Sequence, residues 1–271
     1  MPTRDPFLSN INQCLQLKQH GYASRARKAL ESSGMADLHD PQVREASRAL
    51  FPPASNATLP ALPVSAPRVA LEMDDLSKTV KACDNGSAAG ISGWSSAHLR
   101  ILIDDPDCAA GLLVLCTDIC NGHLDRRAKP YLLASRYVAP LKPNGDIRPV
   151  CINEPLYKVC ATYLNGLNKK PIADVLLPVN FGCGVKGGVD FAATCTTALL
   201  TDPENPDCGM KEDAQNAFNS IERKTVLQRL YDEESLSSMW RLANWSYNEP
   251  SPVFVMVGWR DPRRNAVFSR R

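Results

Sequence analysis

The feature that most constrains this sequence is a turn signal between two β-rich runs. Residues 136–153 are RYVAPLKPNGDIRPVCIN, with the tripeptide Pro143-Asn144-Gly145 near the middle. Asn-Gly is a strong signal for a hairpin turn, so the stretch predicts a β-hairpin with Lys142 and Arg148 flanking its turn. Such a hairpin can present both cations on one side, which suits a triphosphate or a nucleic-acid backbone. The alternative is a solvated hairpin whose charges only protect an edge strand, and composition alone favours this alternative.

The rest of the pattern is helical with few strands, which predicts an α+β fold that is rich in helices. Asp-Pro pairs at 40–41 and 105–106 mark helix starts, and Gly34 and Gly122 mark helix ends. The segment 51–68 holds five prolines and predicts a linker or an extended surface arm. We expect further helices that begin with Asp74 as a cap and at Ser95 or Ser96, and helices over 155–176, with a possible break at Pro171, over 189–200 and over 223–244. Short strands are expected at 210–213 and 253–257. After residue 258 the sequence offers little that can be buried.

Composition excludes several classes of protein. Among the 271 residues, 44% are hydrophobic, enough for a core, and 31 basic against 29 acidic side chains exclude a histone-like protein. No apolar run approaches the length of a membrane span, and the first residues lack the apolar region of a signal peptide. We therefore expect an intracellular protein, nuclear or cytoplasmic, without membrane contact. The ten cysteines are scattered and predict reduced thiols.

Two possible ligand sites are weak. Cys116, Cys120 and His123 have the spacing of one helix face, but zinc sites normally draw ligands from several elements. A buried helix with cysteines as small hydrophobic residues is the favoured interpretation. The glycine-rich segment 182–188 is not a phosphate-binding P-loop, because Lys186 is followed by glycine instead of Ser or Thr.

Basic residues and one carboxylate are the remaining candidates. Between 126 and 170, nine basic residues face only two acidic ones. In the segment MKEDAQNAFNSIER (210–223), Asp213 follows an expected strand and Phe218 lies five residues further on. Such a carboxylate can bind magnesium for phosphoryl transfer. Taken alone, the pattern favours a helix cap for Asp213.

Four segments, taken together, resemble the N-terminal part of a reverse transcriptase of the non-LTR (LINE-type) retrotransposon family. Residues 84–100 resemble the segment ahead of the fingers, 135–158 the fingers hairpin, and 177–193 the Gly-rich entry to the palm. Residues 210–223 closely match the first catalytic palm motif. The four segments occur in the family's order, and the series covers about 20–250.

The resemblance implies an incomplete right-hand polymerase. It has an N-terminal helical extension and linker (1–70), a fingers region (71–200) and a partial palm (201–271). It implies RNA-directed DNA polymerase chemistry, with an RNA template, a DNA primer, dNTP and Mg²⁺. It further implies catalysis and metal binding by Asp213 with the Ala214 carbonyl, and nucleotide binding by Lys142, Arg148, Ala214 and Phe218. Nucleic-acid binding is implied for Lys158, Arg136, Lys169 and Lys170.

The sequence also departs from the family. Asn180 and Glu212 replace the residues usual at those positions, and no Asp-Asp pair follows Asp213. One carboxylate cannot hold two metal ions for in-line transfer, so we expect no polymerisation by this chain alone. A palm without its later strands would leave an unpaired edge at the Asp213 strand and an uncovered apolar face on the helices around 223–244, so we also expect marginal stability. The alternatives are a non-enzymatic nucleic-acid-binding relic of a retroelement and a small helical protein without a ligand.

Overall fold

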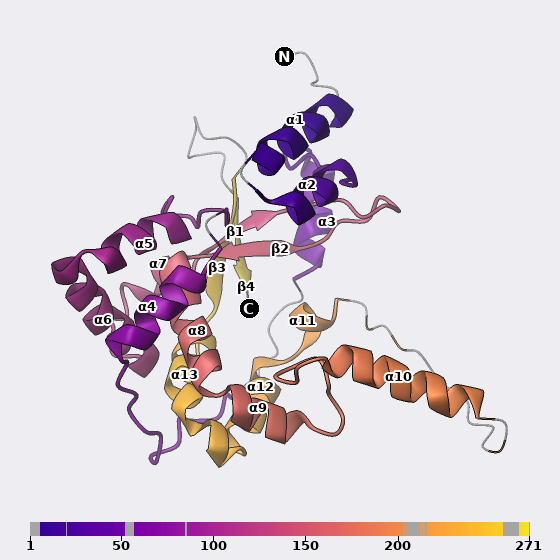
Figure 1. Ribbon diagram of the computed structural model, residues 1–271. Coiled ribbons are helices and arrows are strands. Elements are labelled where there is room, and N and C mark those ends of the chain that lie inside the picture. The colour runs from indigo at the N-terminus through magenta and orange to yellow at the C-terminus, as the bar shows by residue number, and fades with distance from the viewer. Residues whose placement is uncertain are drawn as a thin grey trace. The chain divides into compact units, whose positions relative to one another are not determined.

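The computed structural model describes residues 6–19, 21–51, 57–84, 86–202, 204, 212, 214, 216–256 and 266–270. It divides into two compact units, one made of residues 1–50, 136–152 and 253–268, the other of 51–135, 153–252 and 269–271. Each unit combines segments that are distant in the sequence, and Figure 1 shows their elements. The fold is α+β and rich in helices, as the sequence predicts. The domain boundaries at 70 and 200 stay predictions.

The first unit combines N-terminal helices with a sheet. Helix α1 packs against α2. Asp40 caps α3 by accepting a hydrogen bond from the Gln42 N–H at 2.8 Å, with Pro41 in the first turn, as predicted. The sheet has the order β2-β1-β3-β4, and the predicted hairpin joins β1 to β2. The bounds are α1 (Pro6–Gln19), α2 (Ala23–Leu30), α3 (Pro41–Ala49), β1 (Ser135–Val138), β2 (Val150–Asn153), β3 (Ser251–Val255) and β4 (Ala266–Arg270).

Strand β4 lies in the tail, of which the sequence predicts only that little can be buried. Hydrogen bonding to β3 brings Ala266–Arg270 into the sheet, although the local sequence carries arginines. A backbone ladder needs no particular side chain, so a pattern of side chains alone does not reveal it.

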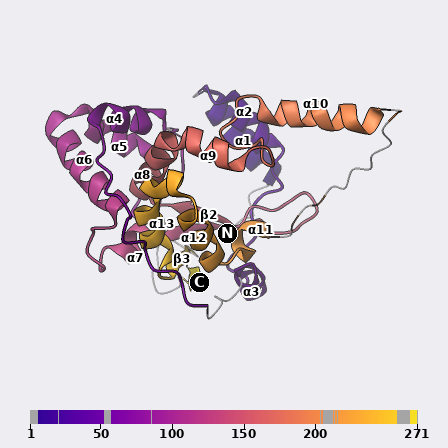
Figure 2. The same cartoon turned by 90° about the horizontal axis from the view of Figure 1, so that it is seen from below.

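The second unit is a helical assembly around one core, seen from below in Figure 2. Its core side chains come from α4, α5, α6, α8 and α13. Leu76, Val80 and Cys83 are buried on one side of α4, as their spacing predicts. The bounds are α4 (Met73–Ala82), α5 (Ser96–Asp104), α6 (Pro106–Asn121), α7 (Lys129–Leu132), α8 (Pro155–Leu167), α9 (Lys169–Leu176), α10 (Gly188–Thr201), α11 (Ala217–Ser220), α12 (Arg223–Tyr231), the 3₁₀ helix η1 (Glu234–Met239) and α13 (Trp240–Tyr247).

The proline-rich segment is an extended arm over residues 57–68. Side chains of the helices hold its end and the residues that follow. The Arg241 guanidinium donates to the Pro67 carbonyl at 2.9 Å, and Asn121 exchanges hydrogen bonds with the Val69 backbone at 2.8 and 2.7 Å. The Tyr163 hydroxyl accepts from the Glu72 N–H at 2.9 Å.

Two expected helix boundaries are wrong. Glu72 is the N-cap of α4, so Asp74 lies in the first helical turn. The long helix breaks at Asn168 and not at Pro171. The Asn168 amide donates to the Leu164 carbonyl at 2.8 Å and accepts from the Ser238 hydroxyl at 2.9 Å, while Pro171 fits the first turn of α9.

No helix in the described parts of the chain is both long enough and apolar enough to cross a bilayer.

Candidate nucleic-acid interface

The hairpin fixes how Lys142 and Arg148 are presented. Leu141 and Ile147 form an antiparallel bridge. On its two sides, the Lys142 N–H donates to the Asp146 carbonyl at 2.7 Å and the Arg148 N–H donates to the Pro140 carbonyl at 2.9 Å. Since side chains alternate between faces along a strand, Lys142 and Arg148 share the face opposite to Leu141 and Ile147.

The turn itself uses the predicted chemistry. Gly145 has φ +87°, a conformation that glycine adopts without strain. The Asn144 side chain accepts from the Asp146 N–H at 3.2 Å and donates to the Asp146 carboxylate at 2.8 Å. These local bonds hold the turn that separates the two cations.

Both hairpin cations are accessible to a phosphate. The Lys142 ammonium lies 3.9 Å from the Asp146 carboxylate, and both side chains are partly exposed. An exposed ion pair of this length contributes about 0–1 kcal/mol, so a phosphate can displace it at little cost. Arg148 is exposed and forms no ion pair with another described residue.

The other predicted contacts lie on separate elements. Arg136 is half-buried on β1, whereas Lys158, on α8, is exposed opposite the buried Val159 and Cys160. Lys169 and Lys170 open α9, where the Lys170 ammonium pairs with Asp174 at 2.5 Å. Arg136 belongs to the first unit and the three lysines to the second.

Three basic side chains of the cluster noted in the sequence have acidic partners, and one of the three is also buried. Arg126 pairs with Glu249 at 2.8 Å, and Arg127 pairs with Asp125 at 2.9 Å. Lys129 is 5% exposed, bonds to Asn248 and lies 3.7 Å from Glu249. Burial lowers the pKa of the Lys129 ammonium, although Glu249 opposes the shift. Lys129 is therefore less available to a nucleic acid than its sequence position suggests, whereas Arg126 and Arg127 keep exposed side chains within their ion pairs.

The predicted catalytic segment is only partly described. Asp213 lies outside the described residues, as does most of the expected strand 210–213. Ala214 is exposed. Phe218 lies in α11 with 95% of its surface exposed. The Asn219 amide donates to the Asn216 side chain at 3.1 Å, which ties the two ends of this turn together.

The cysteine candidate is a core feature, as the favoured interpretation holds. Cys116 and Cys120 are fully buried, whereas His123 follows Gly122, whose φ of +66° ends the helix. Hydrogen bonds with Cys116 and Cys120, together with burial, raise the pKa of the Cys160 thiol well above its ordinary value. Nowhere in the described residues do three or more His, Cys, Asp or Glu side chains gather as a metal site.

The glycine-rich segment closes on itself before α10. Gly187, with φ +69°, is the N-cap of the helix. A Cβ on Gly188 would lie 2.0 Å from the Phe181 carbonyl oxygen, so the chain passes too close to itself for a side chain. The glycines thus have a steric role in turning the chain into the helix.

One buried carboxylate was missed in the sequence. Glu154, the residue before α8, is 6% exposed. Its carboxylate accepts from the Ser92 N–H at 2.9 Å and from the Ser92 hydroxyl at 2.6 Å. Ser92 belongs to the segment that resembles the one ahead of the fingers, and Glu154 directly follows the hairpin. No spacing rule links residues 62 positions apart, and the only signal was the position of Glu154 before Pro155.

Comparison with known proteins finds sequence similarity to a protein of a mobile genetic element. No family model matches it. The "Retrotransposable element SLACS 132 kDa protein" of Trypanosoma brucei gambiense is 26% identical over 194 residues, which is 68% of this chain. The chain spans 15% of the length of that relative. The similarity supports a retroelement origin for this chain.

Proposed function

We propose that this chain is the fingers region and first palm segment of a non-LTR reverse transcriptase, an RNA-directed DNA polymerase. The observation that carries the proposal is the hairpin, whose register sets Lys142 and Arg148 on one face within a segment that resembles the fingers hairpin. The relative from a retrotransposable element gives it independent support.

In this proposal the hairpin cations bind the triphosphate of the incoming dNTP. Arg148 can bind phosphate oxygens bidentately and Lys142 acts as a point charge. Lys158, Arg136, Lys169 and Lys170 contact the backbone of the RNA template and DNA primer. The exposed Phe218 ring is available to pack against the sugar of the nucleotide.

Magnesium would be held by the Asp213 carboxylate and the Ala214 carbonyl, both oxygen donors of the kind Mg²⁺ prefers. When bound, the ion would stabilise charge on the phosphates during transfer. The residues up to 271 contain no Asp-Asp pair after Asp213 to complete a two-metal site. We therefore expect no primer extension by this chain alone.

RNA binding tests the proposal directly. Fluorescence anisotropy with a single-stranded RNA oligonucleotide, measured over a range of salt, compares the double variant Lys158→Ala/Lys169→Ala, which removes two exposed lysines assigned to the nucleic-acid backbone, with the native chain. Loss of two phosphate contacts should reduce the slope of log K against log salt by about 1.4, at roughly 0.7 per contact. The matched control is Arg126→Ala/Arg127→Ala, which removes the same charge from two exposed residues that the proposal does not assign to nucleic acid. Equal slopes for the two double variants would refute the assignment of Lys158 and Lys169 to the nucleic-acid backbone.

The same measurements separate the proposal from a non-enzymatic nucleic-acid-binding relic. A polymerase segment should bind dNTP in the presence of Mg²⁺. Both Asp213→Asn and Lys142→Ala/Arg148→Ala should abolish that binding while RNA affinity persists, and unchanged dNTP binding in the second variant would refute the hairpin assignment. RNA binding without any dNTP binding would identify a relic.

A further inference from the structure

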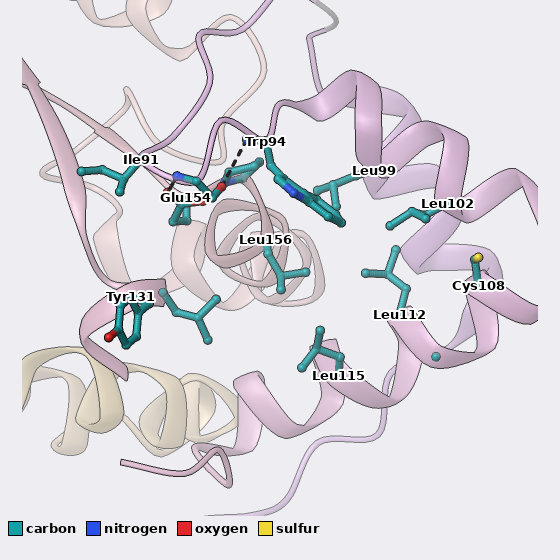
Figure 3. A pocket seen from close by; sticks show the side chains of 14 residues that line it. Ile91, Trp94, Leu99, Leu102, Cys108, Leu112, Leu115, Tyr131, Glu154 and Leu156 are labelled. Atoms are coloured by element: carbon teal, nitrogen blue, oxygen red, sulfur yellow. Dashed lines mark hydrogen bonds between the residues drawn. The ribbon is translucent and has the colours of Figure 1, made fainter. Parts of the chain in front are cut away.

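A pocket of about 480 Å³ lies within the second unit, and none of its lining residues is among those assigned to nucleic acid above. Its wall is formed by the loop before α5 and by α5, α6, α7 and the start of α8, and is almost entirely apolar (Figure 3). The aliphatic side chains are Leu99, Leu102, Leu112, Leu115 and Leu156. Pockets of this size and character typically bind small organic molecules.

Two aromatic side chains lie at the surface of this pocket. Trp94 is 46% exposed and Tyr131 is 78% exposed, although both are large and amphipathic. Aromatic rings of this kind add contact area for an apolar ligand and form favourable contacts with a positively charged group.

The carboxylate of Glu154 gives the pocket its polarity. In Figure 3, Glu154 and Ile91 lie on one side of the pocket, and Leu102 and Cys108 lie on the opposite side. Only 6% of the surface of Glu154 is exposed, and no described Lys, Arg or His forms an ion pair with it. The backbone of Gly90 packs directly against its carboxyl group.

The hydrogen bonds of Glu154 leave room for a ligand. Ser92 supplies two donors, one to each oxygen. A carboxylate has about four lone-pair sites, so about two remain for another donor. Because a buried carboxylate is costly without a cation, a positively charged nitrogen in this pocket would be favoured over a neutral group.

From these features we infer that the pocket binds a small hydrophobic amine. The apolar body is buried among the leucines and the aromatic rings, and the ammonium donates to the carboxylate of Glu154. Neither the proposed polymerase activity nor nucleic-acid binding enters this inference.

Binding of 4-phenylbutylamine to the full chain tests it, with the neutral 4-phenyl-1-butanol as the matched ligand. Isothermal titration calorimetry or ligand-observed NMR gives the two dissociation constants. We expect the amine to bind about tenfold more tightly, the factor appropriate to one charge-assisted hydrogen bond. In Glu154→Gln this preference should disappear.

A second pair of variants tests the location without disturbing Glu154. Gly111 lines the pocket, and a Cβ there would meet no atom within 4 Å. Gly111→Leu should therefore fill the space and weaken both ligands about tenfold or more without unfolding α6. Gly166→Leu is the matched control, because Gly166 also has open space around its Cβ but lies outside the pocket lining, on α8.

Several outcomes would overturn the inference. Failure of the amine to bind, equal affinity for the amine and the alcohol, or unchanged binding in Gly111→Leu would each do so. Binding of a lysine-containing amphipathic peptide, in the absence of amine binding, would assign the pocket to a protein partner instead.

Discussion

Substitution of Gly90 by alanine tests whether Glu154 fixes the loop before α5. A Cβ at Gly90 would lie 2.5 Å from Oε1, 2.7 Å from Cδ and 2.8 Å from Oε2 of Glu154. The carboxylate is the end of a flexible side chain and could move away from the new methyl group. Movement, however, would break or lengthen its two hydrogen bonds with Ser92.

The expected loss of stability follows from these two alternatives. Overpacking in a fixed environment costs about 1–3 kcal/mol. Each hydrogen bond to a charged group contributes roughly 1.5–3 kcal/mol, and rotation of the carboxylate can retain one of the two. We therefore expect Gly90→Ala to lower the free energy of unfolding by about 2–3 kcal/mol. At about 2–4 °C per kcal/mol for a chain of this size, Tm falls by roughly 4–12 °C.

Urea and thermal unfolding followed by circular dichroism measure the effect. Gly166→Ala is the control with the same chemical change, since its Cβ meets nothing within 4 Å and alanine favours a helix by up to about 1 kcal/mol. In a Glu154→Ala background the penalty of Gly90→Ala should vanish, because the clashing atoms are gone. Native stability of Gly90→Ala, or an equal penalty in both backgrounds, would refute the reasoning.

Three further predictions concern other elements. Asn168→Ala should destabilise the chain by about 1–2 kcal/mol in urea unfolding, because the Leu164 carbonyl loses one of its two donors and the Ser238 hydroxyl loses its acceptor. A neutral result would mean that these side-chain contacts do not hold the break between α8 and α9. The hydrogen bond with Asp105 raises the pKa of the exposed Cys108 thiol, which lowers its thiolate fraction at a given pH. Asp105→Asn, which keeps a good N-cap residue, should shift the pH profile of Cys108 alkylation, measured by mass spectrometry, to lower pH. An unchanged profile would contradict this prediction. Gly188→Ala forces a Cβ to 2.0 Å from the Phe181 carbonyl, so limited proteolysis should cut residues 181–188 faster, whereas unchanged cleavage would contradict the close approach.

Local chemistry made part of this fold predictable. The Asn144-Gly145 turn and the caps at Asp40 and Asp105 depend on residues two or three positions away, so their geometry follows from sequence neighbours. The four-residue spacing of Leu76 and Val80 likewise accounts for the buried face of α4. The same locality gave the face shared by Lys142 and Arg148, because hairpin register depends on the turn.

Tertiary contacts decided what these local signals could not. At the break between α8 and α9, the Asn168 side chain accepts a hydrogen bond from Ser238, 70 positions away, whereas a composition rule would have placed the break at Pro171. Arg126 belongs to the basic cluster noted in the sequence, where no acidic partner for it is apparent. In the structure it forms an ion pair with Glu249, more than 100 positions away.

The sequence by itself therefore determined the helices, the hairpin, the resemblance to a reverse transcriptase and the two cations at the turn. Only the tertiary structure determined which charges are paired and that Glu154 is buried beside an apolar pocket. The physical reason is that the desolvation and pairing of a charge depend on the atoms that lie close to it in space. Many of these atoms belong to residues far away in the sequence, so residue spacing does not reveal them.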